Sequence, residues 1–486
     1  MINSNYHLKS LLRITLFVFF LAGCKKLVDV NPPVTKVTTD NAYSSDATAI
    51  AVVTGLYAQM SANTYPTISI PTISMAAGLS ADELVLWSGN TSTNLIAYYK
   101  NTLSINTGGF EFWNNIYPYI FTCNAAIAGI NASTSISPLV KQQLLGEAMF
   151  LRAFYYFYLV NLYGDVPLVL TTDYNVNATL PRTPKKDVYN QIIADLQTAR
   201  NYLNDGYVKS DAVTVYSPVS SAERVRPNKS TASALLARVY LYTENWTNAD
   251  SMATSVISNS TYYKLTSLDT VFLKNSQEAI WQLQPITNNT ITNTAEAVFF
   301  ILSVAPAGVN SSHPVYLNPL LINSFEANDS RKTHWTNTYT DASGTYYYPY
   351  KYKVTTVGTS VTTTEYRMML RLGEQYLIRA EARAMEGNLA GAITDLNIIR
   401  NRAGLPATTA TMQSDILKSI QHERQVELFT EMGQRWLDLK RTNSIDSVMS
   451  VVVPSKNTTW STIQQLYPLP LTDIQRDPKL IQNPGY

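Results

Sequence analysis

The pattern ALLARVYLYTENWTNA at residues 234–249 returns further along the chain as LIRAEARAMEGNLAGA at residues 377–392. Small alanines recur at matching helical positions, and Asn245 and Asn388 mark a turn inside each copy. This spacing is typical of a helix–turn–helix unit of the tetratricopeptide type. Residues 146–153 resemble a weaker third copy. Because such units cannot bury their apolar faces alone, we expect them to stack on one another.

The rest of the chain predicts a mainly α-helical protein. Residues 278–284 predict a strand, and residues 346–354 predict extended chain broken by a proline. Residues 204–229 and 261–369 lack a sustained period and are rich in Thr, Ser, Asn and Tyr, so we expect them to form an irregular, loop-rich layer over the helical scaffold. Apolar residues recur with helical spacing in eight segments: 40–60, 110–130, 137–163, 187–203, 230–243, 370–385, 389–402 and 415–440.

The composition excludes several classes of function. The 486 residues carry 37 Lys and Arg against 35 Asp and Glu, so the chain has no basic field with which to bind nucleic acid. Only 15% of the residues are charged, whereas there are 32 tyrosines. The surface should therefore form hydrogen bonds and stacking contacts rather than attract by charge. With four histidines and two cysteines, we predict no metal site, no cofactor and no catalytic residue.

The first residues indicate export. Lys9 and Arg13 precede the short apolar run 14–21, and Leu21-Ala-Gly-Cys24 is similar to a bacterial lipobox. We therefore predict a signal peptide at 1–23, lipidation of Cys24 as a membrane anchor, and a flexible tether at 24–37. The alternatives are an ordinary secretory signal and a core helix with a chance cysteine. Cys123 lies in an apolar helical stretch and is expected to be a core residue.

A series of motifs, taken in order, resembles the SusD/RagB family of surface nutrient-binding lipoproteins. The resemblance extends over nearly the whole chain, although Leu372-Gly373 replaces the more usual Ala-Glu pair. The motifs are GEAMFLR (146–152), LYGDVP (162–167), DSR (329–331), LRLGEQYLIRAEA (370–382), NIIRNRAGL (397–405), ERQVELF (423–429), GQRWLDLKR (433–441), YPLP (467–470) and QNPGY (482–486).

The resemblance implies a SusD-like fold and a binding function. Residues 38–486 are expected to form one domain, with a helical part at about 38–260, a loop-rich insert at about 261–369 and a second helical part at about 370–486. Members of the family capture an oligosaccharide or other nutrient and pass it to a SusC-type TonB-dependent transporter. The resemblance implies that the protein is located at the outer membrane and faces the cell surface. It also implies that the protein is not an enzyme.

Aromatic residues in polar, non-periodic stretches are the candidate ligand contacts, because apolar sugar faces stack on aromatic rings. Trp87 is the leading candidate because Asp82, Glu83, Ser88 and Asn90 are close to it in sequence. Each aromatic could instead be packed beneath a loop. The tryptophans in helical or strand patterns, at 113, 246, 281 and 436, are expected in the core. The remaining ligand-binding candidates are Tyr98, Tyr99, Tyr65 and Trp335, and more weakly Tyr339 and Tyr346 to Tyr348.

The sequence leaves two alternatives to a binding function. A surface glycan-degrading enzyme needs two opposed carboxylates, and Glu423, Glu427 and Glu431 recur along one helix face. We predict instead that nearby arginines neutralise these acids. They are Arg424 and Arg435, together with Arg379, Arg383, Arg400 and Arg402 from paired helices. The HExxH zinc motif is incomplete, since Val426 occupies the second histidine position. The other alternative is a tetratricopeptide-type scaffold that binds proteins.

Overall fold

The computed structural model describes residues 39–62, 72–217, 221–286, 292–306, 313–355 and 361–486. By internal packing the chain divides into residues 1–42 and a compact unit of residues 43–486. In the first unit, the described residues form the short helix α2 (Thr39–Ala42). The predicted signal peptide, Cys24 and the tether lie outside the described residues. In the described part of the chain, every helix is too short or too polar to cross a membrane.

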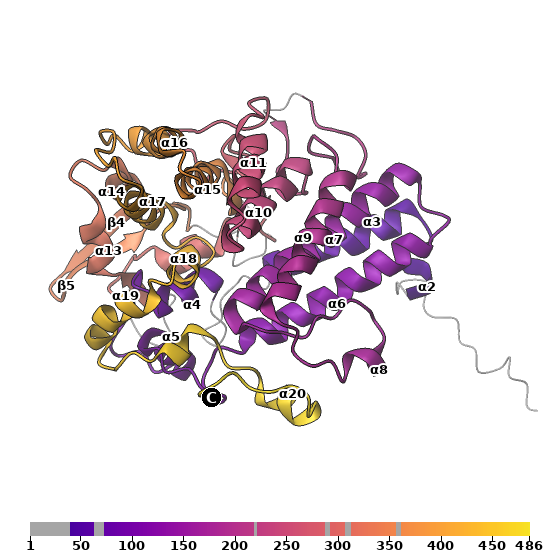
Figure 1. Ribbon diagram of the computed structural model, residues 1–486, viewed down its shortest axis with the longest axis horizontal. Helices are drawn as coiled ribbons and strands as arrows, with labels where there is room; N and C mark the ends of the chain where they lie inside the picture. Colours follow the sequence, from indigo (N-terminus) through magenta and orange to yellow (C-terminus); the bar gives the residue numbers. More distant parts are fainter. Residues whose placement is uncertain (1–38, 63–71, 218–220, 287–291, 307–312, 356–360) are drawn as a thin grey trace, which may run out of the picture. The chain divides into compact units, whose positions relative to one another are not determined.

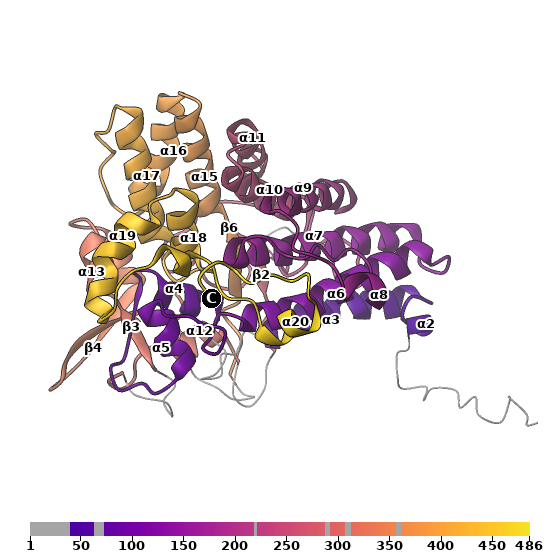
Figure 2. The same ribbon diagram turned by 60° about the horizontal axis from the view of Figure 1, so that its bottom comes forward.

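Residues 43–486 are built on a series of paired helices (Figures 1 and 2). α7 packs between α6 and α9, α9 contacts α10, and the series continues through α11 and α15 to α16 and α17. This arrangement confirms the predicted mainly α-helical class and the stacking of helix pairs. The helices are α3 (Asp46–Ala62), α6 (Glu111–Ala132), α7 (Pro138–Tyr163), α9 (Lys185–Tyr202), α10 (Lys229–Tyr242), α11 (Trp246–Ile257), α15 (Leu372–Met385), α16 (Leu389–Arg402) and α17 (Gln413–Leu428).

The two sequence repeats form the pairs α10–α11 and α15–α16, as predicted. Asn245 and Asn388 occupy the same place in each, where their side chains accept a hydrogen bond from the backbone N–H three residues later. Each asparagine therefore caps the second helix of its pair. Ala237 and Ala380 are fully buried, which lets the neighbouring helices approach closely.

Shorter elements lie beside this scaffold. Among the described residues, three two-stranded antiparallel sheets pair β1 with β3, β2 with β6, and β4 with β5. The strand predicted at 278–284 is confirmed as β2. These elements are α4 (Ile73–Ser80), β1 (Leu84–Leu86), α5 (Thr93–Lys100), α8 (Tyr174–Asn177), β2 (Ala279–Leu283), α12 (Ala295–Phe300), β3 (Val315–Leu317), α13 (Pro319–Ser324), α14 (Ser330–His334), β4 (Thr336–Asp341), β5 (Gly344–Pro349), β6 (Arg367–Arg371), α18 (Gln434–Arg441), α19 (Ile445–Val452), η3 (Val453–Lys456), η4 (Thr462–Gln465) and α20 (Leu471–Arg476).

The single helix predicted at 415–440 is wrong, because the chain breaks between α17 and α18. Thr430, Met432 and Gly433 all have positive φ there. Two of the freed backbone N–H groups find partners from a distant segment: Thr430 donates to Glu83 Oε1 and Met432 donates to Ser74 Oγ. These tertiary hydrogen bonds replace helical ones, so helical periodicity alone could not reveal the break.

The core lies along α7 and the tryptophans packed around it. Trp281 is fully buried, and the rings of Phe150 and Phe154 meet it edge-on at centroid distances of 5.0 and 5.2 Å. Trp113 and Trp436 are also buried, as predicted, whereas Trp246 is only partly buried against this core. Cys123 is fully buried, which confirms the prediction that it is a core residue.

Candidate ligand-binding face

The pairing of β1 with β3 joins two segments that are far apart in sequence. Val85 lies opposite Tyr316, and the backbone N–H of Trp87 donates to the Pro314 carbonyl at 2.9 Å. The indole of Trp87 lies over Gly89, which has no side chain to obstruct it. Trp87 is half-buried, so one part of its ring is packed while another part faces solvent.

Further half-buried aromatics lie beside this strand pair. Tyr316 meets Tyr346 of β5 edge-on at 5.1 Å between ring centroids, and Tyr346 lies opposite Tyr339 of β4. Figure 2 shows α5, β3 and the β4–β5 hairpin on the same side of the unit. We call this set the aromatic face, and its members are Trp87, Tyr99, Tyr316, Tyr339 and Tyr346.

Tyr99 joins the aromatic face from α5. Burial raises the pKa of Tyr99, and the neighbouring Tyr316 raises it further. The Lys456 ammonium lies 5.2 Å from the centre of the Tyr99 ring and caps the carbonyls of Leu79 and Ala81, each at 2.7 Å. The Lys456 side chain therefore packs against one face of the Tyr99 ring. The phenol stays protonated at neutral pH and can both donate and accept hydrogen bonds.

Two of the predicted contacts are core residues instead, which corrects the prediction for them. Tyr98 is fully buried, and its hydroxyl donates to Glu111 at 2.8 Å and accepts from the Gly109 N–H. Successive residues of an α-helix are rotated by about 100°, so Tyr98 of α5 turns inward while Tyr99 remains at the surface. Tyr65 lies outside the described residues.

Trp335 is also fully buried, and its indole N–H donates to the Leu268 carbonyl at 2.9 Å. Lys351 lies 4.9 Å from its ring centre, and Arg371 and Arg402 each lie at 5.7 Å. The ring therefore stabilises buried cations rather than a ligand. Its neighbours in sequence are polar, which is why the local pattern suggested an exposed position.

The acids before Trp87 also face inward. Asp82 pairs with Arg435 through two hydrogen bonds of 2.8 and 2.7 Å, and Glu83 accepts from the Thr430 N–H. Burial, followed by the charge of Asp82, raises the pKa of Glu83 to about 8. Neither group is therefore available to bind sugar hydroxyls at the surface. Ser88, by contrast, is exposed beside Trp87.

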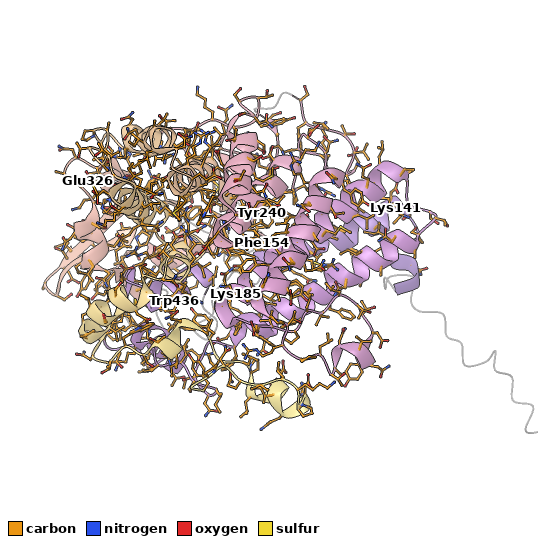
Figure 3. All side chains as sticks on the ribbon, in the orientation of Figure 1. Lys141, Phe154, Lys185, Tyr240, Glu326 and Trp436 are labelled. Carbon is orange, nitrogen blue, oxygen red and sulfur yellow. The ribbon has the colours of Figure 1, made fainter. Side chains whose placement is uncertain are left out.

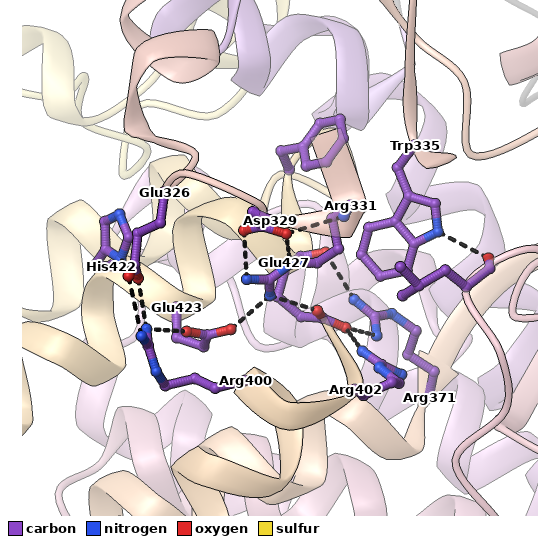
Figure 4. A network of polar contacts seen from close by, with 12 residues as sticks. Glu326, Asp329, Arg331, Trp335, Arg371, Arg400, Arg402, His422, Glu423 and Glu427 are labelled. Carbon is purple, nitrogen blue, oxygen red and sulfur yellow. Dashed lines mark hydrogen bonds and ion pairs between the residues drawn. The ribbon is translucent and has the colours of Figure 1, made fainter. Parts of the chain in front are cut away.

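The carboxylates of α17 are part of a buried ion-pair network, as predicted (Figure 4). Glu423 accepts from Arg331 at 2.6 Å, and Glu427 accepts from Arg331, Arg371 and Arg402. Although burial alone would raise the pKa of Glu427, the guanidinium groups of Arg402, Arg371 and Arg331 hold it well below its usual range. Acids neutralised in this way cannot act as a pair across a sugar cleft.

The partners within this network differ from some of those expected. Arg400 and Arg402 do bind these acids, but Arg379 and Arg383 pair with Asp395 instead. Arg424 pairs with Asp438. The network also includes Arg331 of the short helix α14, Arg371 of β6 and Glu278, which lies in the turn before β2. Helix spacing carries no information about those partners.

One described group has the ligand types for a metal ion, with Glu326, His422 and Glu423 within 4.8 Å of one another. Arg400 contacts both acids, at 2.5 Å to Glu326 and 3.4 Å to Glu423. The guanidinium thus supplies the positive charge that these carboxylates require (Figure 4).

The amino-acid sequence is similar to those of known proteins. The model described as "SusD family" matches residues 171–486, and the model described as "Starch-binding associating with outer membrane" matches residues 37–241. The chain is 26% identical to "SusD-like protein P2" of Formosa agariphila, over 98% of this chain and 99% of that protein.

Solved structures share the fold. A "Laminarin binding SusD-like protein" has a TM-score of 0.73 at 23% identity, covering 91% of this chain and 100% of that one. "Surface glycan-binding protein A" from Bacteroides fluxus has a TM-score of 0.74 at 20% identity, with 91% and 100% covered. A SusD-like protein from Bacteroides fragilis gives 0.73 at 22%, with 94% and 100% covered.

Proposed function

Because the chain belongs to the SusD family, we propose that it is a non-catalytic receptor that binds a glycan on its aromatic face. The match to the family model confirms the family inferred from the sequence motifs. The observation that carries the proposal is the grouping of half-buried aromatics from four separate segments: Trp87, Tyr99, Tyr316 and the Tyr339–Tyr346 pair.

The chemistry of these residues suits a carbohydrate. Each ring offers an apolar surface on which a sugar ring can stack, and each tyrosine hydroxyl can bond a sugar hydroxyl. The rings are held in place by packing, so little conformational entropy is lost on binding. The name of one structural relative, a laminarin-binding protein, supports a polysaccharide fragment as the ligand class.

The proposed setting is the outer-membrane surface. Lipidated Cys24 would anchor the chain, and a SusC-type TonB-dependent transporter would receive the captured glycan. The description of the second family model, which names association with the outer membrane, supports this location. The motif series quoted above supports the transporter as partner.

The decisive experiment measures glycan binding by calorimetry across a panel of neutral oligosaccharides, including laminarin fragments. Trp87→Ala and Tyr346→Ala should each weaken binding roughly three- to tenfold, because each removes one stacking surface. Tyr174→Ala is the matched control: Tyr174 is 79% exposed on α8 and lies outside the aromatic face. It should bind like the wild type.

Three results would contradict the proposal. Unchanged glycan affinity in both Trp87→Ala and Tyr346→Ala would show that the aromatic face is not the binding site. Release of reducing sugars by the wild-type protein, abolished by a single Asp or Glu substitution, would favour the glycan-degrading enzyme. Binding of peptides with no binding of any glycan would instead favour the protein-interaction scaffold.

A further inference from the structure

A pocket lies apart from the aromatic face, and its lining contains no residue of that face. It has a volume of about 830 Å³ and lies between the end of α7, the start of α9, α18 and the C-terminal segment. This volume is within the range of small-molecule sites. Its lining is rich in cationic side chains, namely Arg182, Lys185, Lys440, Arg441 and Lys479.

The acidic residues of the pocket do not balance these cations. The lining contains two acids, Asp165 and Glu244. Asp165 accepts a hydrogen bond from the backbone N–H of Lys185 at 2.7 Å, so one of its carboxylate oxygens is already bonded to the start of α9. Of the five cations, Arg441 is neutralised outside the pocket by Glu381 and Asp438.

Arg182 is held in place by neutral oxygens. Its guanidinium donates to the carbonyls of Asp165, Ile481 and Tyr163, and to the side-chain oxygen of Asn483 at 2.5 Å. These bonds fix the orientation of the group and leave its positive charge without a directly bonded carboxylate among the described residues. Burial lowers the pKa of Arg182, although the charge of the nearby Asp165 opposes this shift.

Lys440 and Lys185 both line this pocket. Lys440 donates to the Asn161 carbonyl, and the Lys185 ammonium lies 5.7 Å from the ring centre of Tyr189. Burial, followed by the charge of Lys185, holds the pKa of Lys440 well below its usual range. Both effects disfavour the protonated form of Lys440, so an anion bound in the pocket would raise this pKa and stabilise the ammonium form.

We propose that this pocket is an anion-binding site for an acidic saccharide, whose carboxylate or sulfate group is held by Arg182, Lys185 and Lys440. The neutral side chains of Asn443 and Gln465 in the lining suit the hydroxyl groups of such a ligand. The choice of a saccharide as the ligand rests on the proposed function. The anion site itself does not, because its cationic residues lie apart from the aromatic face. It thereby adds charged glycans to the ligands of a chain whose overall charge is nearly neutral.

The test uses calorimetry on the full chain with three probes: a galacturonic-acid hexasaccharide, its neutral methyl ester, and inorganic sulfate. Lys185→Glu should weaken binding of the acidic hexasaccharide roughly tenfold or more, because a charge-assisted contact becomes a repulsion. Lys185, labelled in Figure 3, is exposed at the pocket rim, so the variant should fold. Lys186→Glu makes the same charge change at the next, exposed residue outside the lining and should change the affinity less than twofold.

Each outcome has a defined meaning. Equal affinity for the acid and its methyl ester, or equal loss in both variants, would overturn the site. Binding of sulfate without binding of the hexasaccharide would assign the pocket to free inorganic anions and overturn the saccharide. If neither the acidic hexasaccharide nor sulfate binds, both the anion site and its assignment to a saccharide are overturned. Inorganic sulfate has no sugar ring to stack on the aromatic face, so its binding depends on this pocket alone and failure of the aromatic face is distinguishable from failure of this pocket.

Discussion

Arg238 of α10 and Glu374 of α15 form a two-pronged ion pair that joins the two repeat units. Arg238 Nε and Nη2 donate to the two Glu374 oxygens at 2.7 and 2.6 Å, and both side chains are almost fully buried. Gln434 of α18 adds a hydrogen bond to the same carboxylate at 3.1 Å. The pair therefore connects the first repeat, the second repeat and the segment after the helix break.

We predict that Glu374→Ala lowers the free energy of unfolding by about 3–5 kcal/mol, because it leaves the buried Arg238 charge without its partner. Urea denaturation measures the loss. The double variant Arg238→Met/Glu374→Leu removes both charges and should recover most of the stability. A single variant that costs under about 1 kcal/mol would show that the pair does not hold the repeats together.

A second prediction separates the buried tryptophan from the surface one. Trp335→Ala should cost about 3–5 kcal/mol of stability, since it opens a cavity and removes the ring beside Lys351, Arg371 and Arg402. Trp87→Ala, at a half-buried site, should cost no more than about 1 kcal/mol. Thermal denaturation of both variants tests this order, and a larger loss for Trp87→Ala would contradict it.

The buried carboxyl of Glu83 makes stability depend on pH. Its pKa is about 8 in the folded protein and about 4.3 when unfolded, so the folded state holds an extra proton between these values. The stabilisation is full below the unfolded pKa and is lost as the pH rises through about 8.

Glu83→Gln keeps an oxygen that can accept from the Thr430 N–H but cannot ionise. The stability of the wild type relative to this variant should therefore fall from pH 4 to pH 8 and stay level above that, by an amount on the order of a few kcal/mol. Denaturation curves across this range measure the difference. A difference that is constant with pH would show that Glu83 titrates normally.

The anchor prediction concerns the two cysteines. Cys24→Ala should release the protein from the membrane fraction, because the lipidated side chain is lost. Cys123→Ala is the matched control, since Cys123 is buried in the folded unit and should not affect attachment. Fractionation followed by immunoblotting distinguishes the two. Retention of Cys24→Ala on the membrane would contradict the lipobox.

The aromatic face shows how far local sequence can indicate a binding site. Trp87 and Tyr99 stand in polar surroundings that pointed to the surface, and both are half-buried there. The same criterion selected Tyr98 and Trp335, which are buried. No sequence pattern selects Tyr316, because the three-residue strand that carries it is defined by its pairing with β1.

The amino-acid sequence by itself determined the helical scaffold, the repeated pairs and the family, because helical period, capping residues and motif order are properties of neighbouring residues. Only the tertiary structure decided the break before α18, the inward turn of Asp82 and Glu83, and the cationic surroundings of Trp335. Each of these depends on hydrogen bonds or charges supplied by segments far away in the chain. Burial and ion pairing are set by such partners, and local spacing does not encode them.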